Sequence, residues 1–153
     1  MATGSGLPEY DLGGLGLVEL RSGRGVGVAV ADTHPFAVRD WVASAELAGQ
    51  MWIVGAGSAD APEFGAWPDI EEPKVAFAVR DWPTRLGLVA AGLGIALVPG
   101  VAREAVPRGV HWIPVRDEGG GLRRQMWAVT IEGASAAATA MVEALADVVA
   151  ELP

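Results

Sequence analysis

The residues with the clearest chemical potential occupy positions 80–84, where Arg80 is followed by the run Asp81-Trp82-Pro83-Thr84. Proline suits the first turn of a helix, since its missing N–H has no partner to lose there, so a helix is expected to begin at this run. The free N–H groups and the positive dipole end of such a helix attract carboxylates. Thr84 adds a hydroxyl donor, Trp82 a flat apolar wall and Arg80 a charge partner. The alternative is a capped helix whose Trp82 packs into the core.

A second candidate is Ser58, which ends the glycine-rich run 55–58 after an expected strand. Backbone N–H groups of glycine-rich loops can approach an anion closely, and Ser58 is expected to make a polar contact with a ligand. The dinucleotide-binding fingerprint requires a third glycine at position 60, where this chain has Asp60. A simple connecting loop is therefore the alternative, and a dinucleotide site is not expected.

The other chemistry-bearing residues form no catalytic or metal-binding pattern. His34 precedes Pro35 and is expected to cap a turn, while the isolated His111 is expected to be a surface or packed residue of a strand. The chain has no cysteine and no Gly-x-Ser-x-Gly elbow, which excludes thiolate chemistry and removes the signature of serine hydrolases. Three acidic residues in a proline-bounded segment are expected to be solvated rather than paired for acid–base work: Asp69, Glu71 and Glu72.

Composition and charge exclude several classes of protein. A chain of 153 residues suits one domain or two small lobes, and 51% hydrophobic with 20% charged residues excludes disorder. Eleven Lys and Arg against 19 Asp and Glu give a net charge of −8, so direct nucleic-acid contact is not expected. No apolar run approaches the roughly 20 residues of a membrane span, and no signal-peptide pattern opens the sequence. A cytoplasmic location is expected.

Strands alternate with short helices along the sequence, which predicts an α/β fold with a mostly parallel sheet. Apolar runs predict strands over residues 17–20, 26–30, 51–54, 75–79, 95–98, 110–115 and 125–131. The helix that begins near position 82 is expected to end at Gly92 or Gly94. Residues 60–73 predict an irregular surface segment. Five apolar residues at helical spacing are expected to form the packed face of a last helix: Met141, Leu145, Val148, Val149 and Leu152.

Four segments carry more information through their order and spacing. The longest, 79–99, combines a strand, a polar turn and a helix ending Val89-Ala90-Ala91-Gly92-Leu93-Gly94 that leads into an apolar strand with a terminal proline. The others are 28–37 with its His34-Pro35 turn, 46–53, and 123–130 with the amphipathic helix after it. Together they resemble the effector-binding domain of LysR-type transcriptional regulators, truncated at its N-terminus. The resemblance covers about residues 15–152.

This resemblance implies a periplasmic-binding-protein-like (type 2) fold, in which two α/β lobes enclose a cleft for a small molecule. It implies that Arg80, Asp81, Trp82 and Thr84 face the cleft, with Ser58 across the loop. By the same comparison, residues 1–14 are a flexible N-terminal segment and residues 32–116 the second lobe. The first lobe is expected to be incomplete and to consist of residues 15–31 and 123–153.

The expected function is effector sensing by a regulatory domain that lacks the DNA-binding helix-turn-helix. The ligand, a small organic molecule with anionic compounds included, would bias a conformational equilibrium without catalysis, cofactor or metal. A homo-oligomer, most simply a dimer, is expected. Two alternatives stay open. One is a non-enzymatic interaction or oligomerisation module derived from the same fold, and the other is a small enzyme that uses Asp81 and Thr84.

Overall fold

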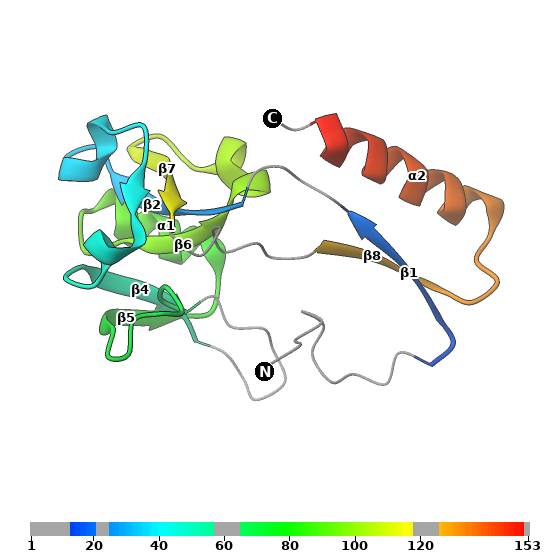
Figure 1. Cartoon of the computed structure of the whole chain (residues 1–153), viewed down its shortest axis with the longest axis horizontal. Coiled ribbons are helices and arrows are strands. Elements are labelled where there is room, and N and C mark those ends of the chain that lie inside the picture. Colours follow the sequence, from blue (N-terminus) through cyan, green and yellow to red (C-terminus); the bar gives the residue numbers. More distant parts are fainter. Residues whose placement is uncertain (1–12, 21–24, 57–64, 118–125, 152–153) are drawn as a thin grey trace. The chain divides into compact units, whose positions relative to one another are not determined.

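The chain consists of two units, which a computed structural model describes over residues 13–20, 25–56, 65–117 and 126–151 (Figure 1). Unit 1 comprises Met1–Arg24 and Arg123–Pro153, and unit 2 comprises Gly25–Leu122. Each unit contains its own strands and one α-helix. The predicted strands all occur, with ends that differ by at most two residues from those expected.

Unit 2 contains six strands, in a four-stranded and a two-stranded sheet that one isolated bridge joins. In chain order they are β2 (Val26–Ala31), β3 (Val42–Ala43), β4 (Met51–Gly55), β5 (Lys74–Val79), β6 (Ala96–Pro99) and β7 (Val110–Arg116). β2 is antiparallel to both β6 and β7, and all six of its residues are buried. β3 is parallel to β7, and β4 is parallel to β5. The sequence does not predict the two-residue β3.

A parallel bridge between Trp52 and Ile95 joins β4 to the rest of this sheet. The Ile53 N–H donates to the Ile95 carbonyl at 2.8 Å, and the Ile95 N–H donates to the Met51 carbonyl at 2.8 Å. The strand order across unit 2 is therefore β3-β7-β2-β6-β4-β5, and every strand except β2 runs in one direction. The expected α/β fold with a mostly parallel sheet is confirmed.

Both faces of the sheet are covered, as near-continuous apolar strands require. One core cluster includes Val28, Trp52 and Leu97, all at most 1% exposed. A second cluster contains Ile53 and Val89, and Val89 lies on the inner side of α1 (Trp82–Ala90). The second cluster fixes α1 against the sheet, so it also fixes the segment at which α1 begins.

The strands approach each other most closely at Gly27 in β2. A Cβ atom there would lie 2.5 Å from the Trp112 ring and would overlap the Ile113 carbonyl oxygen on β7. Because these atoms belong to the neighbouring strand, only glycine fits this position without a shift of β7.

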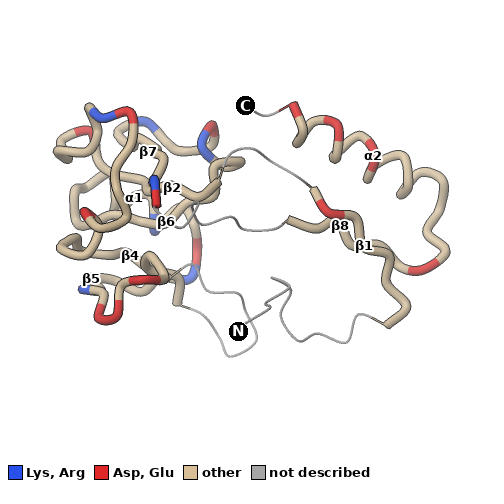
Figure 2. The backbone as a smooth tube through the Cα atoms, viewed as in Figure 1, with Lys and Arg blue, Asp and Glu red and all other residues tan. Residues whose placement is uncertain are grey.

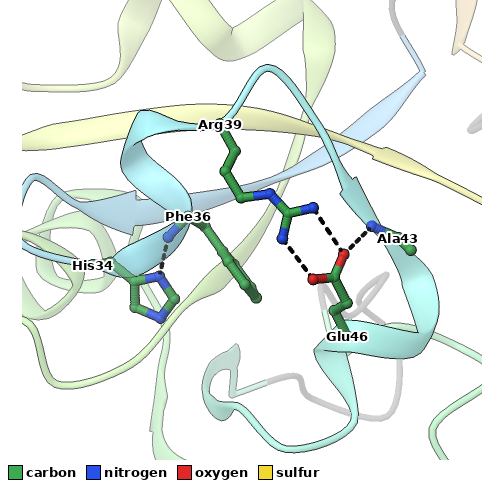
Figure 3. A network of polar contacts seen from close by, with 5 residues as sticks. All are labelled: His34, Phe36, Arg39, Ala43 and Glu46. Atoms are coloured by element: carbon green, nitrogen blue, oxygen red, sulfur yellow. Dashed lines mark hydrogen bonds and ion pairs between the residues drawn. The ribbon is translucent and has the colours of Figure 1, made fainter.

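Three short 3-10 helices connect the strands: η1 (Pro35–Val38), η2 (Ser44–Leu47) and η3 (Gly100–Ala105). Nδ1 of His34 accepts the Phe36 N–H at 3.1 Å, which confirms the expected turn cap. Figure 3 shows how η1 and η2 are linked, since the Arg39 guanidinium pairs with the Glu46 carboxylate, which also accepts the Ala43 N–H. These polar contacts hold the chain between β2 and β4 in place, and the role of His34 in them is structural.

Two expectations within unit 2 differ from the structure. Residues 26–31 were expected in the first lobe, but β2 pairs with β6 and β7 at the centre of the unit 2 sheet. Residues 60–73 were expected at the surface, but Trp67 is only 2% exposed and belongs to the same core cluster as Trp52. Because prolines and acids dominate the composition of this segment, the sequence does not indicate that Trp67 is buried.

Unit 1 contains an antiparallel strand pair, β1 (Leu15–Leu20) and β8 (Met126–Ile131), and the helix α2 (Ala136–Glu151). α2 packs against β1. Of the five apolar residues expected to face the core, Val149 is buried, whereas Met141, Leu145 and Val148 are 62%, 43% and 59% exposed. Leu152 lies outside the described residues. The helix instead turns Val142, Ala146 and Val149 inward, because two strands offer only a narrow surface to pack on.

Candidate functional site

The bend between β5 and α1 is built around Asp81, which caps the helix. Its backbone is extended, with φ −109° and ψ 151°, and its Oδ1 accepts the Thr84 N–H at 2.8 Å. Trp82 is the first residue of the helix and Pro83 the second. The helix start that the sequence predicts is therefore confirmed, with a carboxylate cap in addition to the proline.

This cap changes what the helix end can offer a ligand. Pro83 has no N–H, and the Thr84 N–H is already used by Asp81. The hydrogen bonds from the Thr84 backbone and hydroxyl lower the pKa of Asp81, so the carboxylate is held in its charged form. The expectation of free N–H groups that attract a carboxylate is therefore wrong at these two positions, and the recognition of an anion must depend on side chains.

The bend faces solvent. Arg80, Asp81, Trp82 and Thr84 are all exposed, with Trp82 at 37%. The alternative in which Trp82 packs into the core is wrong, although the helix is capped as that alternative supposed. Ser58, the fifth expected site residue, lies outside the described residues. The Ala56 N–H donates to the Val79 carbonyl at 2.8 Å, so the chain leaves β4 and β5 at the same edge of the sheet.

The most unusual side chain at this bend is Arg85, which the sequence analysis did not select. It is only 4% exposed, and its guanidinium carbon lies 4.5 Å from the centre of the Trp82 ring. Its Nε and Nη1 are buried, and neither has a hydrogen-bond partner in the described part of the chain. Burial lowers the pKa of Arg85 from its ordinary value. The helical spacing could have predicted this burial, because Arg85 lies one turn before Val89 and therefore on the same buried face of the helix.

The helix ends where the sequence predicts. Ala91 is its C-cap residue, and Gly92 adopts a left-handed conformation with φ +74°. Glycine adopts this conformation without the steric cost of a Cβ, which makes it the usual residue after a helix. The return from α1 to β6 is thereby fixed, and with it the position of the bend over the sheet edge.

Other polar residues of unit 2 lie at a hollow of about 490 Å³ that is lined by the η1–β3 connection, η3 and β7. Its basic side chains are already paired. Arg39 contacts Glu46, Arg103 contacts Glu104 at 3.0 Å, and Nε2 of His111 contacts the Asp32 carboxylate at 2.8 Å. None of the expected site residues lines this hollow. The exposed acids Asp69, Glu71 and Glu72 are solvated as expected.

The charges of the two units differ in kind. In Figure 2 the described Lys and Arg residues all lie in unit 2, whereas the charged residues of the described part of unit 1 are all acidic. Within the described residues no cluster of three or more His, Asp or Glu side chains is suited to hold a metal ion. No helix in those ranges is long and apolar enough to cross a membrane. Among the described residues, the positive charges that could attract an anion therefore all belong to unit 2.

Comparison with known proteins relates this geometry to one family. Residues 8–150 match the family described as the LysR substrate binding domain. Solved structures similar to the chain include the effector binding domain of QuiR in complex with shikimate, with a TM-score of 0.62, 19% identity, and coverage of 94% of this chain and 68% of that one. The BenM effector binding domain with its effector benzoate gives a TM-score of 0.65, 21% identity, and coverage of 93% and 66%.

A third similar structure is HinK, a LysR family transcriptional regulator from Pseudomonas aeruginosa. Its TM-score is 0.67 at 16% identity, with coverage of 96% of this chain and 53% of HinK. The chain thus spans about two thirds of the two effector domains and about half of HinK. No curated protein matches the sequence. At these identities the structural likeness establishes the fold.

Proposed function

The chain belongs to the LysR substrate binding domain family, and we propose that it binds a small organic effector at the bend between β5 and α1. The family has the periplasmic-binding-protein-like fold of type 2. The observation that carries the proposal is the solvent exposure of the bend at the carboxyl end of a parallel strand. This is the edge at which open α/β sheets bind their ligands.

The proposed site comprises Arg80, Asp81, Trp82 and Thr84, together with Ser58 on the segment that follows β4. Trp82 offers an apolar ring, and Arg80 offers a positive charge in solvent. Asp81 and Thr84 hold each other and thereby keep the bend in one conformation. The effector would contact the outer surface of this preorganised turn.

The role of the site is regulatory and non-enzymatic in this proposal. An effector that binds one conformation better than another shifts the equilibrium between them by its difference in affinity. The domain would act in the cytoplasm as part of an oligomeric regulator, with no direct nucleic-acid contact by these residues. The BenM domain has benzoate as its effector and the QuiR domain binds shikimate, so small organic acids are the first compounds to test.

A thermal-shift titration tests this proposal. A panel of organic acids, the corresponding neutral amides and amino acids is added to the purified chain, and binding to the native state alone raises its stability by RT ln(1 + [L]/Kd). At a ligand concentration of 100 Kd this is about 2.7 kcal/mol. Heat release on titration confirms each compound that raises the melting temperature.

Two tryptophans provide a matched pair of variants for this titration. Trp82 is 37% and Trp41 36% exposed, and each ring lies near an arginine, Arg85 at 4.5 Å and Arg116 at 4.6 Å. Trp82→Leu should abolish the ligand-induced shift, whereas Trp41→Leu should retain it. If no compound in the panel stabilises the chain, or both variants lose the shift equally, the site is not at the bend.

Association of copies of the chain through unit 1 is the second candidate function. Large apolar side chains of this unit are exposed: Val129 at 51%, Ile131 at 72%, Met141 at 62% and Val148 at 59%. Exposed apolar surface and open strand edges favour association. Light scattering would then give a mass that is a multiple of the chain and that falls in the variant Met141→Gln/Val148→Gln. A monomer at all concentrations would exclude this function.

A further inference from the structure

Among the described residues Arg85 is the buried charged side chain, and no hydrogen bond or ion pair in those ranges compensates its buried Nε and Nη1. The residue is 4% exposed, and Nε and Nη1 have no hydrogen-bond partner among the described residues. A charge taken out of water is costly unless an opposite charge or full hydrogen bonding compensates for it. A salt bridge that stabilises the fold would show such a partner, and Arg85 has none in the ranges described.

The guanidinium is held at the start of α1. Side chains in helices lean back toward the N-terminus, and the Arg85 guanidinium carbon lies 4.5 Å from the ring of Trp82, the first residue of the helix. The positive end of the helix dipole is at the same place. The charged Asp81 carboxylate already caps that end, so the positive charge that remains for an anion beside the exposed Trp82 ring is that of Arg85.

The carboxylate nearest in the sequence does not supply the missing partner. Asp81 accepts the Thr84 N–H at 2.8 Å and is exposed, whereas Nε and Nη1 of Arg85 are buried. The described residues therefore supply no anion that compensates Arg85. The exposed surface of the Trp82 ring lies next to it and suits an apolar body rather than a bare inorganic ion.

We propose that Arg85 is the specificity-determining residue of this site and that it pairs with the carboxylate of an organic acid whose apolar part contacts Trp82. This inference rests on the proposed effector site and names the ligand class for it. On binding, the Arg85 guanidinium reorients on its flexible stem so that its N–H groups reach the carboxylate oxygens and donate charge-assisted hydrogen bonds to them. A neutral amide of the same shape would leave the buried charge uncompensated and would bind more weakly.

Calorimetric titration of the whole chain with acetate, benzoate, shikimate and sulfate, at constant ionic strength in chloride, tests the proposal. Benzamide is the neutral counterpart of benzoate. We expect saturable binding of at least one organic carboxylate, with sulfate and benzamide at least about tenfold weaker. Arg85→Met and Arg85→Gln should weaken carboxylate binding about tenfold or more, and Arg85→Lys should weaken it less, because the charge is kept. Arg108→Met, which removes an exposed charge from the same unit, should bind as the wild type does.

Several results would overturn this assignment and leave the effector site standing. These are equal binding of benzamide and benzoate, unchanged carboxylate binding in Arg85→Met, or binding of neutral panel compounds alone that Trp82→Leu abolishes. Preferential binding of sulfate would replace the organic acid by an inorganic oxyanion. If neither charged nor neutral compounds bind, the proposed function fails together with the inference. A circular dichroism spectrum of each variant establishes that it is folded.

Discussion

Replacing Arg85 by methionine should stabilise the effector-free protein. The side chain is 4% exposed, and two of its buried nitrogens, Nε and Nη1, have no partner among the described residues, so the folded state bears their desolvation cost. Methionine has a similar length, no polar hydrogen and a flexible stem that fills irregular space. The variant therefore removes the cost while it keeps most of the packing on the sheet.

The size of the effect follows from the contacts of Arg85. Each buried polar group without a partner costs about 1–3 kcal/mol, so the two nitrogens cost roughly 2–6 kcal/mol. The substitution also removes the contact between the guanidinium and the Trp82 ring at 4.5 Å, which contributes about 0.5–2 kcal/mol. Subtracting the second range from the first gives a gain of about 0–5 kcal/mol in the free energy of unfolding, with a central value of about 2–3 kcal/mol.

Urea unfolding and a thermal melt, both without added organic acids, measure this gain. At roughly 2–4 °C per kcal/mol for a chain of this size, a gain of about 2 kcal/mol raises the melting temperature by about 4–8 °C. Arg108→Met removes an exposed charge from the same unit and should change the free energy of unfolding by less than about 0.5 kcal/mol. If Arg85→Met lowers the stability while Arg108→Met does not, the guanidinium is favourable in the free protein and the argument from an uncompensated charge is wrong.

Three further predictions test the elements that position the site. Because its hydrogen bonds lower the pKa of Asp81, its contribution to stability is complete above the ordinary carboxyl pKa and is lost as the pH falls through the lowered value. Asp81→Asn keeps a capping side chain, so acid titration followed by circular dichroism should show a smaller loss of stability at low pH than in the wild type. Gly27→Ala should lower the free energy of unfolding by about 1–3 kcal/mol, because the added carbon overlaps β7. Gly87→Ala in α1, where nothing lies within 4 Å of the added carbon, should raise it by about 0.5–1 kcal/mol. Equal effects of the two substitutions would contradict the close approach at Gly27. Val149→Ala should lower the free energy of unfolding, measured in urea, by about 1–2 kcal/mol, and Val148→Ala should hardly change it, because Val149 is 9% and Val148 59% exposed. The reverse order would mean that α2 packs through the face that the sequence predicts.

The fold was predictable from the sequence where local signals agree with the packing. Strands such as β2 and β6 are continuous apolar runs, and the helix between β5 and β6 has a polar cap, an early proline and a glycine at its end. Each of these signals depends on residues close in the sequence. The order of the strands depends on which distant segments pair, and local signals do not predict it.

Two expectations failed because burial is decided by the surface that an element meets. In α2 the stripe of Met141, Leu145 and Val148 is as apolar as the buried face, but the narrow strand pair of unit 1 covers only one of the two. In the segment before β5, Trp67 is buried in the core, with Ala66 and Ile70 packed against it, although prolines and acids dominate the segment. Composition averages over such a segment and cannot show which one side chain is buried.

The site itself illustrates the same limit most clearly. Sequence reasoning selected Arg80 for its charge and made no prediction for Arg85. The helix nevertheless places Arg85 one turn before Val89, on the face that the sheet covers. A charged residue on a buried helical face contradicts the local pattern, and such contradictions persist where function compensates for the lost stability. Arg85 should therefore behave in opposite ways in two measurements, since its removal should stabilise the free protein and weaken its binding of organic acids. If Arg85 had a purely structural role, its replacement would lower the stability of the free protein and leave the binding of organic acids unchanged.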